Sequence, residues 1–272
     1  MVSTDRIFEL LDDDAQLEDT VSGQDVPKVC GRVEFRHVWF AYTGENWVLK
    51  DVSFTVEPGQ SFAFVGETGA GKSTIISLLS RFYAPQKGQI LLDGRDISLL
   101  SLEQLRRHVA VVLQDVFLFS GSISENVRLG NREITDEQVD RALRLACARD
   151  FIDRLPQGMD TPVTERGSTF SAGQRQLLSF ARAIAHDPAV FVLDEATASI
   201  DTETEQLIQR SVTSVSRGRT TLIIAHRLST IRACDCICVL HDGRIVEQGN
   251  HARLLSLNGA YARLCRAQSE QE

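Results

Sequence analysis

Residues 61–78 read S-F-A-F-V-G-E-T-G-A-G-K-S-T-I-I-S-L. A short apolar run from Phe62 to Val65 has the length and the aromatic and β-branched content of a buried strand. The run stops at Gly66, where a glycine-rich turn begins, and an apolar-periodic stretch typical of a helix starts at Thr74. The sequence therefore predicts a strand, a tight turn and a helix in direct succession.

The turn, G-E-T-G-A-G-K-S over residues 66–73, fits the P-loop pattern G-x-x-x-x-G-K-[ST] in full. Glycines let successive backbone N–H groups face one anion, and the following helix adds the positive end of its dipole. A solvated lysine beside an ordinary glycine turn is the alternative, but strand, motif and helix in register favour phosphate binding. We predict that the chain binds a nucleoside triphosphate, with Lys72 at its β- and γ-phosphates and Ser73 on Mg²⁺. The predicted nucleotide-binding residues of this turn are Gly66, Glu67, Thr68, Gly69, Ala70, Gly71, Lys72, Ser73 and Thr74.

Composition narrows the class of protein. The chain has 272 residues and a formal net charge of −8, without a run of Lys and Arg interleaved with aromatic residues, so we expect no nucleic-acid partner. Because no apolar run approaches the ~18 residues that span a bilayer, we expect the chain as given to be soluble. Cys234, Cys236 and Cys238 alternate as one face of a strand would, which favours core packing over metal binding.

The remaining patterns predict an α/β protein with a P-loop NTPase core of the RecA type. Ser/Thr-x-x-Glu/Gln capping boxes at Ser101, Ser122 and Thr135 predict the starts of three helices. About sixty residues from Asp115 lack a convincing strand, which indicates a helical subdomain, about 115–178, inserted into the core. Early strands punctuated by Pro58-Gly59 indicate an antiparallel β subdomain. The expected strands are 33–40, 49–56, 61–65, 90–92, 109–113, 189–194, 220–224 and 237–240.

A second cluster of catalytic character follows one of the later strands. Phe191-Val192-Leu193-Asp194 is apolar and ends in an acid, as a central strand of a parallel sheet with a ligand at its carboxyl end would. We predict that Asp194 holds Mg²⁺ through its water shell and that Glu195 polarises the attacking water. An acid that caps the next helix is the alternative, but it does not account for two acids in succession.

With these motifs in order, residues ~30–265 resemble the nucleotide-binding domain of an ABC transporter of the exporter type. The resemblance implies that Tyr42 stacks on adenine, Gln114 touches Mg²⁺ or water, and His226 contacts the γ-phosphate. From the residues alone, Tyr42 is also compatible with a core aromatic, Gln114 with a helix cap, and His226 with a core histidine. Three further segments resemble family motifs: T-E-R-G at 164–167 the X-loop, F-S-A-G-Q at 170–174 the signature, and S-I-D at 199–201 the D-loop.

The same resemblance implies how the chain works. Two such domains close head to tail over two ATPs, and Ser171, Gly173 and Gln174 serve the ATP held by the partner. The stretch R-I-F-E-L-L-D, residues 6–12, resembles the segment that follows the last membrane helix of a half-transporter. We therefore expect residues 1–29 to be a linker from an absent membrane domain and 30–268 to be the nucleotide-binding domain. It would hydrolyse ATP at the cytoplasmic face of a membrane.

One position departs from the family pattern. The signature of the family reads L-S-G-G-Q, whereas this chain has Ala172 in place of the first glycine. Alanine adds a Cβ where backbone and phosphate must approach closely, and it penalises a positive φ. Since this segment serves the partner while Lys72, Glu195 and His226 are present, we predict a heterodimer with one degenerate site. The alternatives are a homodimeric half-transporter and a soluble ABC ATPase without a transport role.

Overall fold

The structure is a computed structural model that describes residues 29–113, 115–164, 167–195, 202–216, 218–225 and 228–269. These residues form two main β-sheets. The larger sheet contains β3 (Ser61–Val65), β6 (Val109–Val112), β9 (Val190–Glu195), β10 (Thr220–Ala225), β11 (Cys236–His241) and β12 (Arg244–Gly249). The smaller sheet contains β1 (Val33–Ala41), β2 (Trp47–Val56), β4 (Lys87–Leu92) and β5 (Arg95–Asp96). A separate ladder pairs β7 (Gly121–Ser122) with β8 (Pro162–Val163).

The directions of the strands indicate where a ligand-binding site would lie, because ligands bind at the carboxyl ends of parallel strands. The larger sheet has the order β12-β11-β3-β10-β9-β6, and its strands are parallel except for β12. The pairs β1·β2, β1·β4 and β4·β5 of the smaller sheet are antiparallel. Because parallel strands end at one edge, the carboxyl ends of β3, β6, β9 and β10 lie side by side there.

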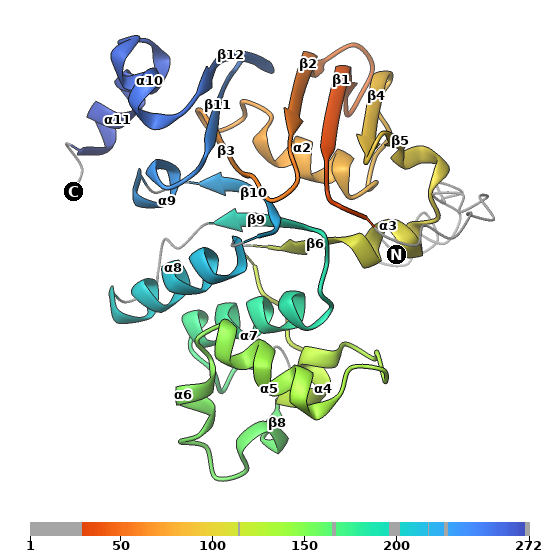
Figure 1. Cartoon of the computed structure of the whole chain (residues 1–272), viewed down its shortest axis with the longest axis vertical. Coiled ribbons are helices and arrows are strands. Elements are labelled where there is room, and N and C mark those ends of the chain that lie inside the picture. The colour runs from red at the N-terminus through yellow and green to blue at the C-terminus, as the bar shows by residue number, and fades with distance from the viewer. Residues whose placement is uncertain are drawn as a thin grey trace, which may run out of the picture.

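Helices surround both sheets, and Figure 1 shows α4 to α8 on the side of the larger sheet away from the smaller one. The α-helices are α2 (Lys72–Leu79), α3 (Leu102–His108), α4 (Ile123–Arg128), α5 (Asp136–Leu145), α6 (Arg149–Ile152), α7 (Ala172–Ala185), α8 (Thr202–Ser216), α9 (Leu228–Arg232), α10 (His251–Ser256) and α11 (Ala260–Ser269). Two 3₁₀ turns cover Ile97–Leu99 and Gly158–Asp160. Within the described ranges, none of these helices has the length and apolar character that crossing a membrane requires.

Two hydrophobic cores cover the two faces of the larger sheet, because successive side chains of a strand point to opposite faces. Phe62 and Phe64 of β3 pack with the smaller sheet, α2 and α3. Ala63 and Val65 of the same strand pack instead with α4, α5, α7 and α8. The predicted α/β fold class is confirmed, and the antiparallel sheet shares a core with α2, the helix that follows the phosphate loop.

The predicted capping boxes at Ser101, Ser122 and Thr135 all form and begin α3, α4 and α5. The ladder β7·β8 corrects the expectation that the sixty or so residues from Asp115 contain no strand, although each of its strands has only two residues.

The three clustered cysteines are buried, as predicted for core residues, but they do not share one face. Cys236 and Cys238 lie in β11 and pack on the side of α2 and the smaller sheet. Cys234 precedes the strand and packs in the other core. The prediction placed all three cysteines in one strand. The strand begins at Cys236, and Cys234 lies in the turn after α9.

Candidate functional site

The phosphate loop lies between β3 and α2, and two of its glycines are required by their surroundings. Gly66 has φ 149° and Gly71 has φ 102°, both in the region that glycine tolerates best. A Cβ at Gly66 would lie 2.2 Å from the carbonyl oxygen of Leu240, and one at Gly71 would lie 2.6 Å from a methyl group of Leu49. The loop therefore packs tightly on its protein side. A Cβ at Gly69 would meet nothing within 4 Å, so that part of the loop is open.

Lys72 is the first residue of α2 and its side chain returns to the start of the loop. The residue is only 7% exposed, and its ammonium group donates to the carbonyl oxygens of Gly66 at 2.7 Å and Glu67 at 2.8 Å. Burial lowers the pKa of Lys72, and the negative charge of Asp194 opposes part of this shift. A buried cation held by neutral carbonyls can exchange them for a phosphate oxygen, which is a stronger, charge-assisted partner.

The amino end of α2 is suited to an anion. Its N-cap is Gly71 in a left-handed conformation, and this cap makes no side-chain hydrogen bond to the helix. The first N–H groups of a helix have no partner within it, and the helix dipole makes this end positive. The exposed hydroxyl of Ser73 lies in the same first turn. Backbone N–H groups, Lys72 and this hydroxyl together make a set of donors that suits a phosphate.

The carboxyl edge of the larger sheet places the acidic residues beside this loop. In β9, Asp194 pairs with Ile224 and Glu195 pairs with Ala225 of β10, and β10 pairs in turn with β3, which leads into the loop. Asp194 is half-buried, and its charge acts on Lys72. Hydroxyl and carboxylate oxygens such as those of Ser73 and Asp194 are the ligands that Mg²⁺ prefers. The predicted site residues Gln114 and His226 lie outside the described residues.

Tyr42 follows β1 and faces the amino end of α2. Its hydroxyl shares a hydrogen bond of 3.1 Å with the hydroxyl of Thr74. Tyr42 is 50% exposed, so the reading as a core aromatic is wrong, and a half-exposed ring can stack on a flat base. Sequence reasoning missed the neighbours of this ring, Phe40 and Tyr83, because nothing local marks Tyr83 as a contact.

The signature segment begins α7. The Ser171 hydroxyl accepts from the Gln174 N–H at 3.1 Å, and the Gln174 side chain accepts from the Ser171 N–H at 3.0 Å. Ala172 is the exposed first residue of the helix and is not among the residues with positive φ. The expected φ penalty at Ala172 is therefore wrong, and only the steric argument remains. Gly173 is buried in the same turn.

The signature residues and the phosphate loop belong to different parts of this chain. The helix α7 packs with α4 and α5, whereas α2 packs in the core that contains the smaller sheet. Ser171 and Gln174 bond to each other, as described above. Of the X-loop segment, Glu165 and Arg166 lie outside the described residues, as does the D-loop segment 199–201.

Comparison with protein families matches residues 49–198 to the family described as ABC transporter, which covers the phosphate loop, the signature and the β9 acids. The chain belongs to the ABC transporter family. The resemblance drawn from its motifs is thereby confirmed, and as an ABC domain it is an ATPase.

Among known proteins, this ABC domain is 50% identical over 271 residues to the probable multidrug resistance ABC transporter ATP-binding/permease protein YheH of Bacillus subtilis, covering 100% of this chain and 40% of that protein. It is 47% identical over 266 residues to the ATP-dependent lipid A-core flippase of Pseudomonas aeruginosa, covering 97% of this chain and 44% of that protein.

A solved structure of a bacterial Atm1-family ABC exporter with ATP bound is also similar. It has a TM-score of 0.84 and 41% identity, covering 98% of this chain and 47% of that one. The ABC domain thus spans less than half the length of each of these three proteins.

An apolar groove of about 470 Å³ lies on this ABC domain between β6 and α7. Exposed side chains of Phe82, Leu113 and Leu129 line it, and Arg182 of α7 lies in its wall. Arg182 donates to the main-chain oxygen of Asn126 at 2.9 Å, which ties α7 to α4. No local pattern of residues predicted this groove, because its lining comes from four separate segments.

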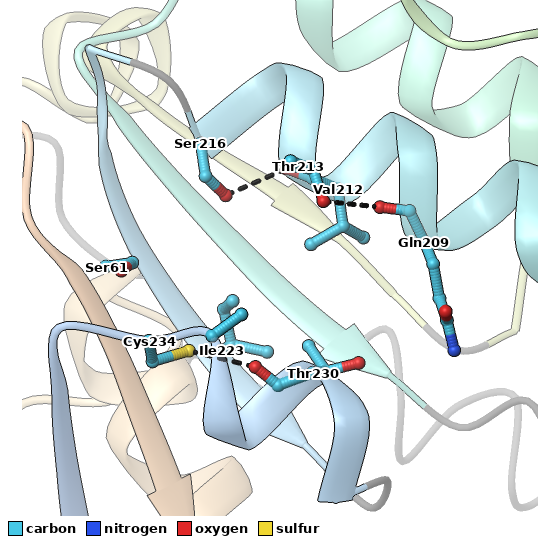
Figure 2. A pocket seen from close by; sticks show the side chains of 9 residues that line it. Ser61, Gln209, Val212, Thr213, Ser216, Ile223, Thr230 and Cys234 are labelled. Atoms are coloured by element: carbon cyan, nitrogen blue, oxygen red, sulfur yellow. Dashed lines mark hydrogen bonds between the residues drawn. The ribbon is translucent and has the colours of Figure 1, made fainter. Parts of the chain in front are cut away.

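A second cavity, of about 250 Å³, lies between α8, α9 and β10 (Figure 2). Its hydroxyl and thiol donors are already engaged, since Thr213, Ser216 and Cys234 donate to main-chain carbonyls one helical turn earlier. These bonds stabilise the helices, and they leave this cavity poorly equipped to hold a phosphate. The nucleotide-binding candidate therefore remains the carboxyl edge of the larger sheet.

Proposed function

We propose that this domain binds MgATP at the carboxyl edge of its larger sheet and hydrolyses it to drive export across a membrane, at whose cytoplasmic face it works. The observation that carries the proposal is the buried Lys72, which spans the phosphate loop while the charge of Asp194 acts on it. The names of the relatives, which include multidrug and lipid A-core transport, favour an amphiphilic cargo.

Different residues of this chain bind the phosphates, the base and the metal ion and activate the water. Lys72 and the N–H groups of α2 hold the β- and γ-phosphates, and Tyr42 carries the adenine. Ser73, Asp194 and Gln114 hold Mg²⁺, which supplies charge neutralisation at the phosphates. Glu195 orients the attacking water and accepts its proton as the oxygen bonds to the γ-phosphorus and ADP leaves, with His226 at the γ-phosphate.

A second nucleotide-binding domain completes each site. Ser171, Gly173 and Gln174 lie at the amino end of α7 and would face the ATP held by the partner, where a helix end stabilises negative charge. Ala172 puts an exposed Cβ at that end. Ala172 weakens the site that holds the partner's ATP, whereas the residues that bind this chain's own ATP are unaffected. We therefore propose a heterodimer in which the partner's site is the degenerate one.

The groove beside α7 provides a place for the membrane domain. Exposed apolar side chains gathered around a groove mark a surface that a partner covers. This chain spans 40% of a relative whose printed name joins ATP-binding and permease functions, so the remaining length of that protein has room for the permease part. We propose that the membrane domain docks in this groove and is moved as α7 and the phosphate loop of the partner subunit close on ATP.

ATP turnover by this chain, measured over a concentration series, tests the proposal. We expect slow, nearly linear turnover from the wild type and none from Glu195→Gln, which should elute as a dimer with ATP and Mg²⁺. Fast turnover that rises with the square of concentration would instead indicate a homodimer. Failure of the wild type to bind ATP, or full activity of Glu195→Gln, would contradict the ATPase mechanism itself.

A further inference from the structure

The side chain of Tyr42 is fixed from several directions although half of its surface is exposed. Its hydroxyl bonds to Thr74 at 3.1 Å. Its ring meets Phe40 at a centroid distance of 4.9 Å and 85°, and it meets Tyr83 at 5.1 Å and 88°. Such perpendicular contacts are one of the two preferred geometries of aromatic pairs. The ring of Tyr42 therefore has one orientation before any base arrives.

The main chain next to Tyr42 is fixed as well. The side chain of Gln86 accepts from the N–H of Ala41 at 3.0 Å and donates to the carbonyl of Ala41 at 2.7 Å. The N–H of Gln86 donates to the carbonyl of Trp39 at 3.1 Å. Gln86 thus pairs with the end of β1 much as a neighbouring strand would, one residue before Tyr42.

These contacts tie the tyrosine to α2 at both of its ends. Thr74 lies in the first turn of α2, beside the phosphate loop, whereas Tyr83 and Gln86 follow the last residue of the helix, Leu79. A base platform held in this way keeps a constant position relative to the phosphates. Binding then loses less side-chain freedom, which is the general benefit of preorganisation.

We propose that Tyr83 and Gln86 are positioning residues of the base site, which hold Tyr42 in the orientation that stacks on the nucleobase. The inference rests on the proposed function, because it requires a base on Tyr42. It also accounts for Tyr83, an aromatic side chain that is 46% exposed although its ring contacts both Tyr42 and Phe40.

A pair of ligands separates this role from a general structural one. ATP carries a base, whereas inorganic triphosphate carries only the phosphates. We expect Tyr83→Leu to weaken ATP binding by about 2- to 10-fold, the scale of one aromatic pair, and to leave triphosphate binding unchanged. Gln86→Met, which keeps the side-chain length but loses both bonds to Ala41, should weaken ATP binding in the same selective way.

Three comparison variants complete the experiment. Tyr83→Phe keeps the ring and should bind ATP like the wild type, and Leu99→Ala removes an exposed apolar side chain elsewhere and should do the same. Tyr42→Ala should lose about 5- to 100-fold in ATP affinity, the scale of base stacking on an aromatic ring. Thermal melting of each variant accompanies the titrations.

The outcomes are distinguishable. If Tyr42→Ala weakens ATP binding but Tyr83→Leu and Gln86→Met do not, the positioning role is wrong and the proposed base site survives. Equal losses of ATP and triphosphate affinity in Tyr83→Leu and Gln86→Met would also overturn it, since they would indicate general damage to α2. If Tyr42→Ala binds ATP normally, base stacking on Tyr42 is wrong and the positioning role falls with it.

Discussion

Two helices of this domain present their amino ends to phosphate in the proposed mechanism, and the two ends are built differently. The helix α2 begins after Gly71 without a side-chain cap, and Lys72 lies across the adjoining loop. The helix α7 begins with a complete capping box between Ser171 and Gln174. The first end thus has no side-chain cap for its N–H groups, whereas in the second the Ser171 hydroxyl already accepts from the Gln174 N–H.

This difference indicates that the two helix ends have different roles, one in binding ATP and one in its hydrolysis. An uncapped helix end with a buried lysine gains most from an anion, so α2 should determine affinity for ATP. A capped end is stable without a ligand and offers mainly a hydroxyl and a helix dipole. We therefore expect α7 to affect the rate of hydrolysis more than the binding of ATP, and to act on the nucleotide of another subunit.

Loss of the lysine of α2 should reduce ATP turnover more than any other change. Replacing Lys72 by alanine removes the cation of the loop and should lower ATP turnover by about 100-fold or more, the cost of losing a charged donor to a transition state. ATP affinity, measured by titration with a fluorescent analogue, should fall as well. Lys50→Ala, on β2, is the matched control and should do neither. If Lys72→Ala hydrolyses ATP at close to the wild-type rate, the proposed role of α2 and Lys72 in binding the phosphates is wrong.

Gly71→Ala should have the second-largest effect, on both stability and ATP binding. Alanine at φ 102° is strained by about 1–2 kcal/mol. Its Cβ would also lie 2.6 Å from a methyl group of Leu49. Both effects should lower the free energy of unfolding in urea and weaken ATP binding. Gly94→Ala has a similar positive φ but meets nothing within 4 Å, so it should cost less stability and leave ATP binding intact. Equal effects of the two would contradict the packing argument.

At α7 a smaller effect of another kind is expected. Ser171→Ala loses the cap and should destabilise the domain by about 1 kcal/mol. Thr135→Ala removes an equivalent capping box from α5 and should destabilise it similarly. In chains that also carry Ala172→Gly, only Ser171→Ala should slow ATP turnover, and neither should change ATP affinity. If the two variants have the same turnover, Ser171 is no more than a helix cap.

The smallest effect concerns Ala172. Because its backbone is already helical, Ala172→Gly relieves no strain and only removes a methyl group from the helix end. Turnover should rise about 2- to 5-fold, the range of a helix-end contribution. Ala260→Gly, at the first position of α11, is the control and should leave turnover unchanged. No increase for Ala172→Gly would remove the evidence for a degenerate partner site.

Local patterns of sequence predicted much of this architecture. The capping boxes at Ser101, Ser122 and Thr135 form as predicted, because each depends on residues three apart. The P-loop likewise depends on one short segment between a strand and a helix. The alternation of Phe62 and Phe64 against Ala63 and Val65 follows from strand geometry alone.

The features that sequence reasoning missed depend on distant contacts. Gln86 bonds to Ala41 across 45 positions, and Tyr83 meets Tyr42 with no local pattern to mark it. The edge strand β12 has no buried face that an apolar run could reveal. Ala172 was expected to suffer from a positive φ because the family has glycine there, but the helix already begins at that residue.

Mixing two impaired variants asks whether α2 serves this chain's ATP and α7 serves another chain's. In chains that also carry Ala172→Gly, Lys72→Ala loses its own phosphate site and Ser171→Ala loses the hydroxyl offered to a partner. A mixed dimer contains one intact pairing of α2 with α7. We predict that the mixture hydrolyses ATP faster than the sum of the two variants measured alone. Turnover equal to that sum would contradict the account.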